Sequence, residues 1–388
     1  MAINKAANAA VRREIDRAIA ERGEIGIQVA AYLNGELVID TWGGIADQEG
    51  GRPVDGDTLF NVFSVAKAIP ATCIHLQAEK GFLDYDAPIA RYWPEWGCHG
   101  KERATVRDAL THLTGTPQMP PGVNADTIGD WDFVVAGIAA LEPMYPVGEV
   151  PAYQAGIYGW VLGEIVRRTD PRHRSFQTYV RDELAGPLGA ADLWIGLPDD
   201  VLPRVARLID DAKGPPFPED LPIARAVPNH LMLNADIYED PRIRRACIAA
   251  TGGIFTARSI ARLFGMLANG GEIDGVRLLS KDRIDAACEP RPNSLPDPIM
   301  FGTVLPMSQG GYWLHDAGVP TNAPATGART ISVPGHGGSL AWGDPDSGLA
   351  VAFCHNRMSN NMTAEEHPAW DIANIVRTSL GLDAKQPA

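Results

Sequence analysis

A serine and a lysine lie three positions apart in the stretch Phe60-Asn61-Val62-Phe63-Ser64-Val65-Ala66-Lys67. An apolar segment precedes them, and a run of helical character continues to Lys80, before Gly81. In a helix, residues at this spacing share a face, about 5–6 Å apart at Cβ. Serine near neutral pH needs an adjacent base, and a lysine can be that base when burial keeps its amine neutral. The pair therefore predicts a nucleophile, Ser64, with its base, Lys67.

Two features limit this interpretation. The pattern Ser-x-x-Lys is short, and most chance occurrences lie on solvated helix faces. In addition, Pro70 follows Ser64 by six positions, and a proline inside a helix removes a backbone hydrogen bond and kinks the helix. We therefore expect that the helix either bends at Ala66 or starts later than Ser64.

The bulk composition is ordinary for a globular protein, with 388 residues, 45% apolar and 21% charged. A net charge of -14 argues against nucleic acid or an anionic membrane as the main partner. No run approaches the ~18 apolar residues of a membrane span, and the N-terminus lacks the apolar region of a secretory signal. The cysteines have no zinc or disulfide spacing, so we expect reduced thiols in a cytoplasmic protein: Cys73, Cys98, Cys247, Cys288 and Cys354.

Strand patterns gather near both ends of the chain, and helical patterns fill the middle. Asn34-Gly35 predicts a hairpin turn near the N-terminus. The expected strands are Ile25–Val29, Leu37–Trp42, Ile331–Val333, Gly338–Gly343 and Leu349–Cys354. This order predicts a single two-lobed α/β (α+β) domain over residues 1–388, in which an antiparallel sheet flanked by helices (about 1–60 and 325–388) accompanies a mainly helical lobe (about 61–324). A ligand cleft is expected between the lobes.

A proline-rich segment interrupts the helical region. Seven prolines lie between Pro198 and Pro228. Long irregular segments often border a binding cleft, but they also wrap over surfaces. Both interpretations remain open for this one.

Three separated motifs agree with one family. They are Ser64-Val65-Ala66-Lys67 after the first hairpin, Tyr153-Gln154-Ala155 in mid-chain, and His336-Gly337-Gly338 on an expected strand near the C-terminus. Because it contains these three motifs, the chain resembles the serine β-lactamase and penicillin-binding-protein superfamily, most closely the class C β-lactamase branch and the related family VIII carboxylesterases. Each motif is weak alone, but their order and spacing together are specific, and the resemblance covers nearly the whole chain.

The resemblance implies roles for individual residues. Ser64 would be the acylated nucleophile, Lys67 would be or would share the general base, and Tyr153 would pass protons to the leaving group. The backbone N–H groups of Ser64 and Ser339 would form the oxyanion hole. Neither a cofactor nor a metal is implied. The expected substrate contacts are Gln154, His336, Gly337 and Gly338, with Trp342 as a candidate lining residue of an apolar pocket.

Two departures from the class C pattern point away from β-lactams. Class C β-lactamases have serine-asparagine after the tyrosine, where this chain has Gln154-Ala155. They also have lysine-threonine-glycine where this chain has His336-Gly337-Gly338, so a permanent cation is replaced by a mostly neutral imidazole. We therefore expect a carboxylesterase that cleaves short-chain or aryl esters, which are small-molecule substrates, through an acyl-serine.

Other functions stay open. An acyltransferase or an amidase would use the same residues, and a β-lactamase or a non-catalytic binding member is less favoured. His336-Gly337-Gly338-Ser339 looks like the oxyanion loop of an α/β-hydrolase, but in that fold the loop precedes the nucleophile, and here it follows Ser64. Since no Gly-x-Ser-x-Gly motif is present either, a Ser-His-Asp triad is disfavoured. The oligomeric state is not predicted.

Overall fold

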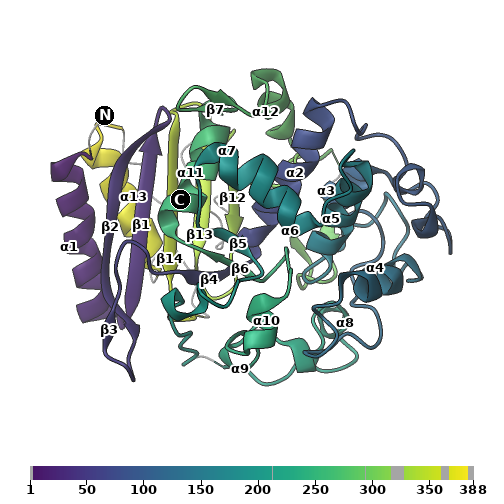
Figure 1. The fold of residues 1–388 in the computed structure, drawn as a ribbon, viewed down its shortest axis with the longest axis horizontal. Helices are drawn as coiled ribbons and strands as arrows, with labels where there is room; N and C mark the ends of the chain where they lie inside the picture. The colour runs from purple at the N-terminus through teal and green to yellow at the C-terminus, as the bar shows by residue number, and fades with distance from the viewer. Residues whose placement is uncertain (1–2, 212, 293, 316–326, 360–366, 383–388) are drawn as a thin grey trace.

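The two ends of the chain build one antiparallel sheet. A computed structural model describes residues 3–211, 213–292, 294–315, 327–359 and 367–382. Within them the main sheet has seven strands in the order β11-β12-β13-β14-β1-β2-β3 (Figure 1). These are β1 Gly26–Leu33, β2 Glu36–Asp47, β3 Arg52–Pro53, β11 Trp313–Leu314, β12 Ile331–Pro334, β13 Leu340–Asp344 and β14 Leu349–His355. Because β14 pairs with β1 in antiparallel register, the expected sheet is confirmed.

The first hairpin forms at the predicted turn. Asn34 and Gly35 have φ of 52° and 77°, which is the backbone of a two-residue type I′ turn. Leu33 consequently pairs with Glu36 across the hairpin. Strand β1 is buried along almost its whole length, because helices cover both faces of the sheet.

Three helices cover the sheet. Helices α1 (Lys5–Arg22) and α13 (Pro368–Ser379) pack on one face and against each other, at the left of Figure 1. Helix α11 (Ala257–Ala268) packs on the opposite face, against β1, β13 and β14. The structure therefore groups α11 with the sheet, although it lies in the middle of the chain, in the range expected for the helical lobe. It is buried around most of its circumference, because it separates the sheet from the helical part.

The remaining helices form the helical part, and one hydrophobic core joins it to the sheet. That core runs from Ala352 on β14 through Phe264 on α11 to Ile74 on α2. No helix in the described ranges is both long enough and apolar enough to cross a bilayer. These helices are α2 Ala68–Glu79, α3 Val106–Leu110, α4 Trp131–Ala139, α5 Tyr158–Thr169, α6 Phe176–Tyr179, α7 Gly186–Leu188, α8 Pro222–Ala226, α9 Ala235–Tyr238, α10 Pro241–Arg245 and α12 Lys281–Ala287.

A small second sheet positions the Ser64 segment. Its strand order is β4-β6-β5, with β4 at Phe60–Phe63, β6 at Gly253–Phe255 and β5 at Leu193–Ile195. Strand β4 leads directly into Ser64, and β6 pairs with it. The loop before β6 is thereby brought beside the residues that follow Ser64. Two short hairpins complete the strands: β7 Glu272–Ile273 with β8 Val276–Arg277, and β9 Pro296–Asp297 with β10 Thr303–Val304.

Candidate active site

Ser64 opens a short 3₁₀ turn, Ser64–Lys67, between β4 and α2. Helix α2 begins only at Ala68, so Pro70 is its third residue. A proline is tolerated there, because the first N–H groups of a helix have no partner within it. Of the two expectations for Pro70, the later start of the helix is confirmed.

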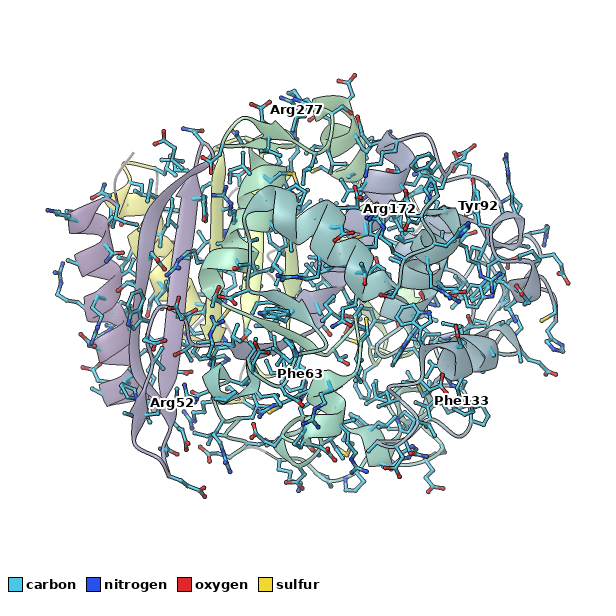
Figure 2. All side chains as sticks on the ribbon, in the orientation of Figure 1. Arg52, Phe63, Tyr92, Phe133, Arg172 and Arg277 are labelled. Carbon is cyan, nitrogen blue, oxygen red and sulfur yellow. The ribbon has the colours of Figure 1, made fainter. Side chains whose placement is uncertain are left out.

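Phe63 holds an unusual backbone conformation immediately before the serine. Its φ of 45° and ψ of -125° are unfavourable for a residue with a side chain, at a cost of about 1–3 kcal/mol. The Phe63 ring is held by Tyr238 and His336, with centroid distances of 4.8 and 5.6 Å. Figure 2 shows Phe63 in the interior, near the junction of the sheet and the helical part. This sharp change of direction turns the chain from β4 into the Ser64 turn.

Lys67 lies beside Ser64 in a buried position. Its Nζ is 3.1 Å from Ser64 Oγ, 2.9 Å from the carbonyl oxygen of Ala155 and 3.0 Å from that of Ala250. A neutral amine has two N–H donors and one lone pair. The two carbonyls take the donors, and the lone pair can accept the Ser64 proton. Burial lowers the pKa of Lys67 to about 7, so a large neutral fraction exists near neutral pH.

Tyr153 completes the cluster. The Lys67 Nζ lies 5.0 Å from the centre of the Tyr153 ring. Burial raises the pKa of Tyr153 well above its usual value, although a hydrogen bond with Ser64 opposes this shift. A phenol that keeps its proton can deliver or relay it, but it is a poor resting base. The arrangement therefore favours Lys67 as the base and Tyr153 as the proton donor to a leaving group.

The loop that carries Tyr153 is held by two residues that the sequence did not single out for this role. Asp297 Oδ2 accepts the backbone N–H of Tyr153 at 2.8 Å, and burial raises the pKa of Asp297 to about 6. The His112 ring lies 4.7 Å from that of Tyr153, and its Nδ1 accepts the N–H of Gln154 at 3.2 Å. Asp297 is 144 positions from Tyr153, so no local spacing pattern could have linked them.

The third motif lies on a tight turn rather than on a strand. Strand β12 ends at Pro334 and β13 begins at Leu340, which corrects the expected strand Gly338–Gly343. The Gly338 N–H donates to the Gly335 carbonyl at 3.1 Å, and Gly337 has φ of 84°, as the third residue of a type II turn requires. His336 and Gly337 thus lie at the tip of this turn and line the cleft.

Gly338 closes the turn and Ser339 follows it, and neither lines the cleft, so Gly338 is not the substrate contact that was expected. The Ser339 carbonyl accepts the Gly335 N–H at 2.7 Å, and its Oγ accepts the His355 N–H at 3.3 Å. Gly338 faces His355 and His367, which leave no room for a side chain. His336 lines the cleft, whereas Ser339 does not. This favours His336 over Ser339 as the second oxyanion donor, beside the Ser64 N–H.

Gly335 brings the end of β12 against the Ser64 segment. A Cβ at Gly335 would lie 2.3 Å from the carbonyl oxygen of Val62, so only glycine allows this approach. The sequence singled out the three residues after Gly335 instead. Within a run containing three glycines, nothing in the residue types indicated where the strand ends.

Two further expected contact residues point elsewhere. The Gln154 side chain is buried and donates to Thr114 Oγ1 at 3.0 Å, so it supports the loop from behind. Trp342 is buried among α1 and α13 on the far face of the sheet. Neither residue lines the cleft beside Ser64.

The cleft beside Ser64 has a volume of about 340 Å³ and is largely apolar. The proline-rich segment borders it, which decides between the two interpretations of that segment. No Asp, Glu, Lys or Arg is among its described lining residues, and no cluster of metal-ligand type occurs in the described part of the chain. The lining is Ser64, Tyr153, Ala155, Phe217, Ile223, Val227, Met232, Leu233, Met300, Phe301, Trp313, Pro334, Gly335, His336, Gly337 and Ser359.

Comparisons with known proteins agree with this geometry. The family model described as beta-lactamase matches residues 11–373. The chain is 33% identical to "Esterase/beta-lactamase LipL" of Mycobacterium tuberculosis, over 93% of this chain and 84% of that protein. Its structure is similar to that of a family VIII carboxylesterase, with a TM-score of 0.84, 28% identity and coverage of 96% of this chain and 99% of that one. A penicillin-binding-protein homologue from Caulobacter crescentus also gives a TM-score of 0.84, at 32% identity over 97% of this chain and 99% of that one.

Proposed function

Since the chain belongs to the beta-lactamase family of serine hydrolases, we propose that it is a carboxylesterase that works through an acyl-Ser64 intermediate. One observation carries the proposal. A lysine with a pKa of about 7 lies 3.1 Å from a serine hydroxyl, at the wall of an apolar cleft. This is the arrangement that an activated serine nucleophile requires.

The proposed acylation follows from the contacts. Lys67 accepts the Ser64 proton while Oγ attacks the ester carbonyl carbon. The N–H groups of Ser64 and His336 stabilise the resulting oxyanion. Tyr153 donates its proton to the departing alcohol and regains one from Lys67, so the acyl group remains on Ser64. Water then attacks the acyl carbon and gives up a proton to Tyr153 and Lys67. The bond between the acyl carbon and Ser64 Oγ breaks, Oγ takes that proton back, and the acid is released.

The neutral cleft supports an ester rather than a β-lactam. Penicillins carry a carboxylate, and no described cation lines the cleft to pair with it. Ala155 offers only a methyl group beside the tyrosine, and its carbonyl is already bonded to Lys67. An ester needs a nucleophile, an oxyanion hole and an apolar groove, and each can be assigned here. An acyltransferase or amidase would use the same residues and differs only in the acceptor or the leaving group.

The test is hydrolysis of p-nitrophenyl acetate, butanoate and benzoate, each with and without an added alcohol. We expect nitrophenol release with each ester and the free acid as the main product. An alkyl ester of the added alcohol as the main product would show acyl transfer instead. No release by the wild type, beyond that of Ser64→Ala, would contradict the proposal.

A further inference from the structure

The cleft beside Ser64 has two walls that differ in their relation to the catalytic groups. Trp313 lies beside Tyr153, with ring centroids 6.2 Å apart, so the leaving alcohol belongs on that side. Another part of the lining includes Val227 and Leu233. The Leu233 backbone adjoins the His336 side chain, so this part of the lining lies next to the turn Gly335–Gly338, here called the oxyanion turn. An ester whose carbonyl oxygen is held at that turn can place its acyl chain along Val227 and Leu233.

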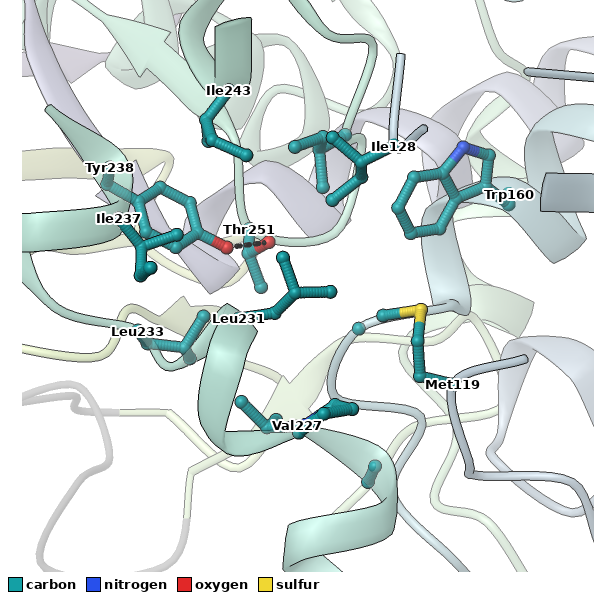
Figure 3. Close-up of a pocket in the computed structure, with 14 residues that line it drawn as sticks. Met119, Ile128, Trp160, Val227, Leu231, Leu233, Ile237, Tyr238, Ile243 and Thr251 are labelled. Carbon is teal, nitrogen blue, oxygen red and sulfur yellow. Dashed lines mark hydrogen bonds between the residues drawn. The ribbon is translucent and has the colours of Figure 1, made fainter. Parts of the chain in front are cut away.

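A second, smaller cavity, here called the inner cavity, adjoins this part of the cleft (Figure 3). Its volume is about 20 Å³, which is room for about one water molecule or methyl group. Its lining is mainly apolar; Tyr238 and Thr251 are polar lining residues, and the Tyr238 hydroxyl donates to Thr251 Oγ1 at 2.6 Å. Val227 and Leu233 line both this cavity and the cleft, whereas Leu231 lines the inner cavity alone.

We propose that the acyl group of the substrate is an unbranched, uncharged chain of medium length, about six to ten carbons, and that Leu233 limits this length. This inference rests on the proposed function and refines its expectation of short-chain esters. An acetyl group would leave most of a 340 Å³ apolar cleft unfilled. The wall that stops the chain is only one side chain thick, because a cavity lies behind it.

Burial of the chain makes the proposal quantitative. Each methylene moved from water into an apolar site gains about 0.8 kcal/mol, which is up to about fourfold in kcat/KM. We expect kcat/KM to increase with each added methylene until the acyl chain reaches Leu233, and to decrease for longer acyl chains. Removing the Leu233 side chain joins the cleft to the inner cavity and should allow a longer chain.

The experiment measures kcat/KM for p-nitrophenyl esters from acetate to dodecanoate, which vary the acyl group and keep the leaving group constant. For the wild type we expect a rise to a maximum near octanoate. Leu233→Ala should move the maximum by about two carbons to longer chains, and Leu233→Phe should move it to shorter ones. Leu231→Ala is the matched control: it enlarges the inner cavity but leaves the wall in place, so its profile should follow that of the wild type.

A wild-type maximum at acetate, or equal shifts in Leu231→Ala and Leu233→Ala, would overturn the proposal while leaving the esterase intact. Binding of alkylboronic acids from butyl to dodecyl, which form reversible adducts with a serine hydroxyl, gives the same chain series without turnover. If binding becomes tighter with chain length but no ester is cleaved, the proposed site for the acyl chain is supported and the proposed esterase function is contradicted.

Discussion

The carbonyl oxygen of Ala155 accepts a hydrogen bond of 2.9 Å from Lys67 Nζ. Ala155 is two residues beyond Tyr153, so this bond fastens the tyrosine loop directly to the lysine that adjoins Ser64. With the Ala250 carbonyl it also takes two of the lysine donors. The same bond therefore leaves the lone pair of a neutral amine free to face Ser64, and it links the Ser64–Lys67 turn to the Tyr153 loop.

The pH profile should follow the ionisation of Lys67. Burial lowers its pKa to about 7, and only the neutral amine can accept the serine proton. We expect kcat/KM for p-nitrophenyl acetate to rise about tenfold per pH unit below 7 and to level off above it. Stopped assays between pH 5 and 9 measure this.

Two other groups titrate near the site and supply controls for that profile. Asp297 has a pKa raised by burial to about 6, and enclosure in the cleft lowers the pKa of His336. Asp297→Asn and His336→Asn should keep the inflection near pH 7, whatever their rates. An inflection that disappears in either variant would assign the base elsewhere.

Lys67 and Tyr153 should act as one unit. Lys67→Ala and Tyr153→Phe should each lower kcat by a few powers of ten, and the double variant should lose little more, because groups that act together are not additive. A double-mutant cycle of kcat measures the coupling. Losses that multiply independently would argue against a shared proton path.

The oxyanion turn should depend on a buried pair behind it. Glu24 Oε2 lies 2.9 Å from His355 Nδ1, and His355 Nε2 donates to the Gly337 carbonyl at 2.9 Å. Burial alone would raise the pKa of Glu24, but the charge and hydrogen bond of His355 outweigh burial, so the pKa of Glu24 lies below its usual value. Glu24→Gln should lower kcat about tenfold through displacement of the turn, with little change in KM.

The control for this variant is Glu21→Gln, which changes an exposed carboxylate in the last turn of α1, three positions before Glu24. It should keep the wild-type kcat. A Glu24→Gln variant that loses thermal stability but keeps its kcat would show that the pair is only structural.

Esters should be preferred over β-lactams. We expect kcat/KM for p-nitrophenyl butanoate to exceed that for benzylpenicillin by at least about 10²-fold, roughly 2.7 kcal/mol of transition-state binding. His336→Lys, at the tip of the turn in the cleft, should narrow the gap by supplying a cation for the penicillin carboxylate. Hydrolysis of penicillin by the wild type as fast as of esters would contradict this account of the cleft.

The sequence predicted the parts of this molecule that depend on local residue types. Asn34-Gly35 specified its hairpin because only residues that tolerate positive φ form a type I′ turn. The order of three motifs predicted the family, and the Ser64 and Lys67 pair formed as its spacing indicated.

The parts that failed depend on contacts across the fold. The orientation of Gln154 is decided by Thr114, and that of Trp342 by the helices over the far face of the sheet. The end of β12 is set by Gly335, because only there does the strand meet the Val62 carbonyl. None of these neighbours is close in sequence to the residue that it positions.

Covalent labelling of Ser64 tests the central claim most directly. The protein is mixed with p-nitrophenyl octanoate, quenched in acid within the first turnovers, weighed intact and then digested. The account predicts a mass increase of one octanoyl group on the peptide that holds Ser64, and none in Ser64→Ala. An acyl group on any other residue, or turnover by Ser64→Ala at the wild-type rate, would contradict it.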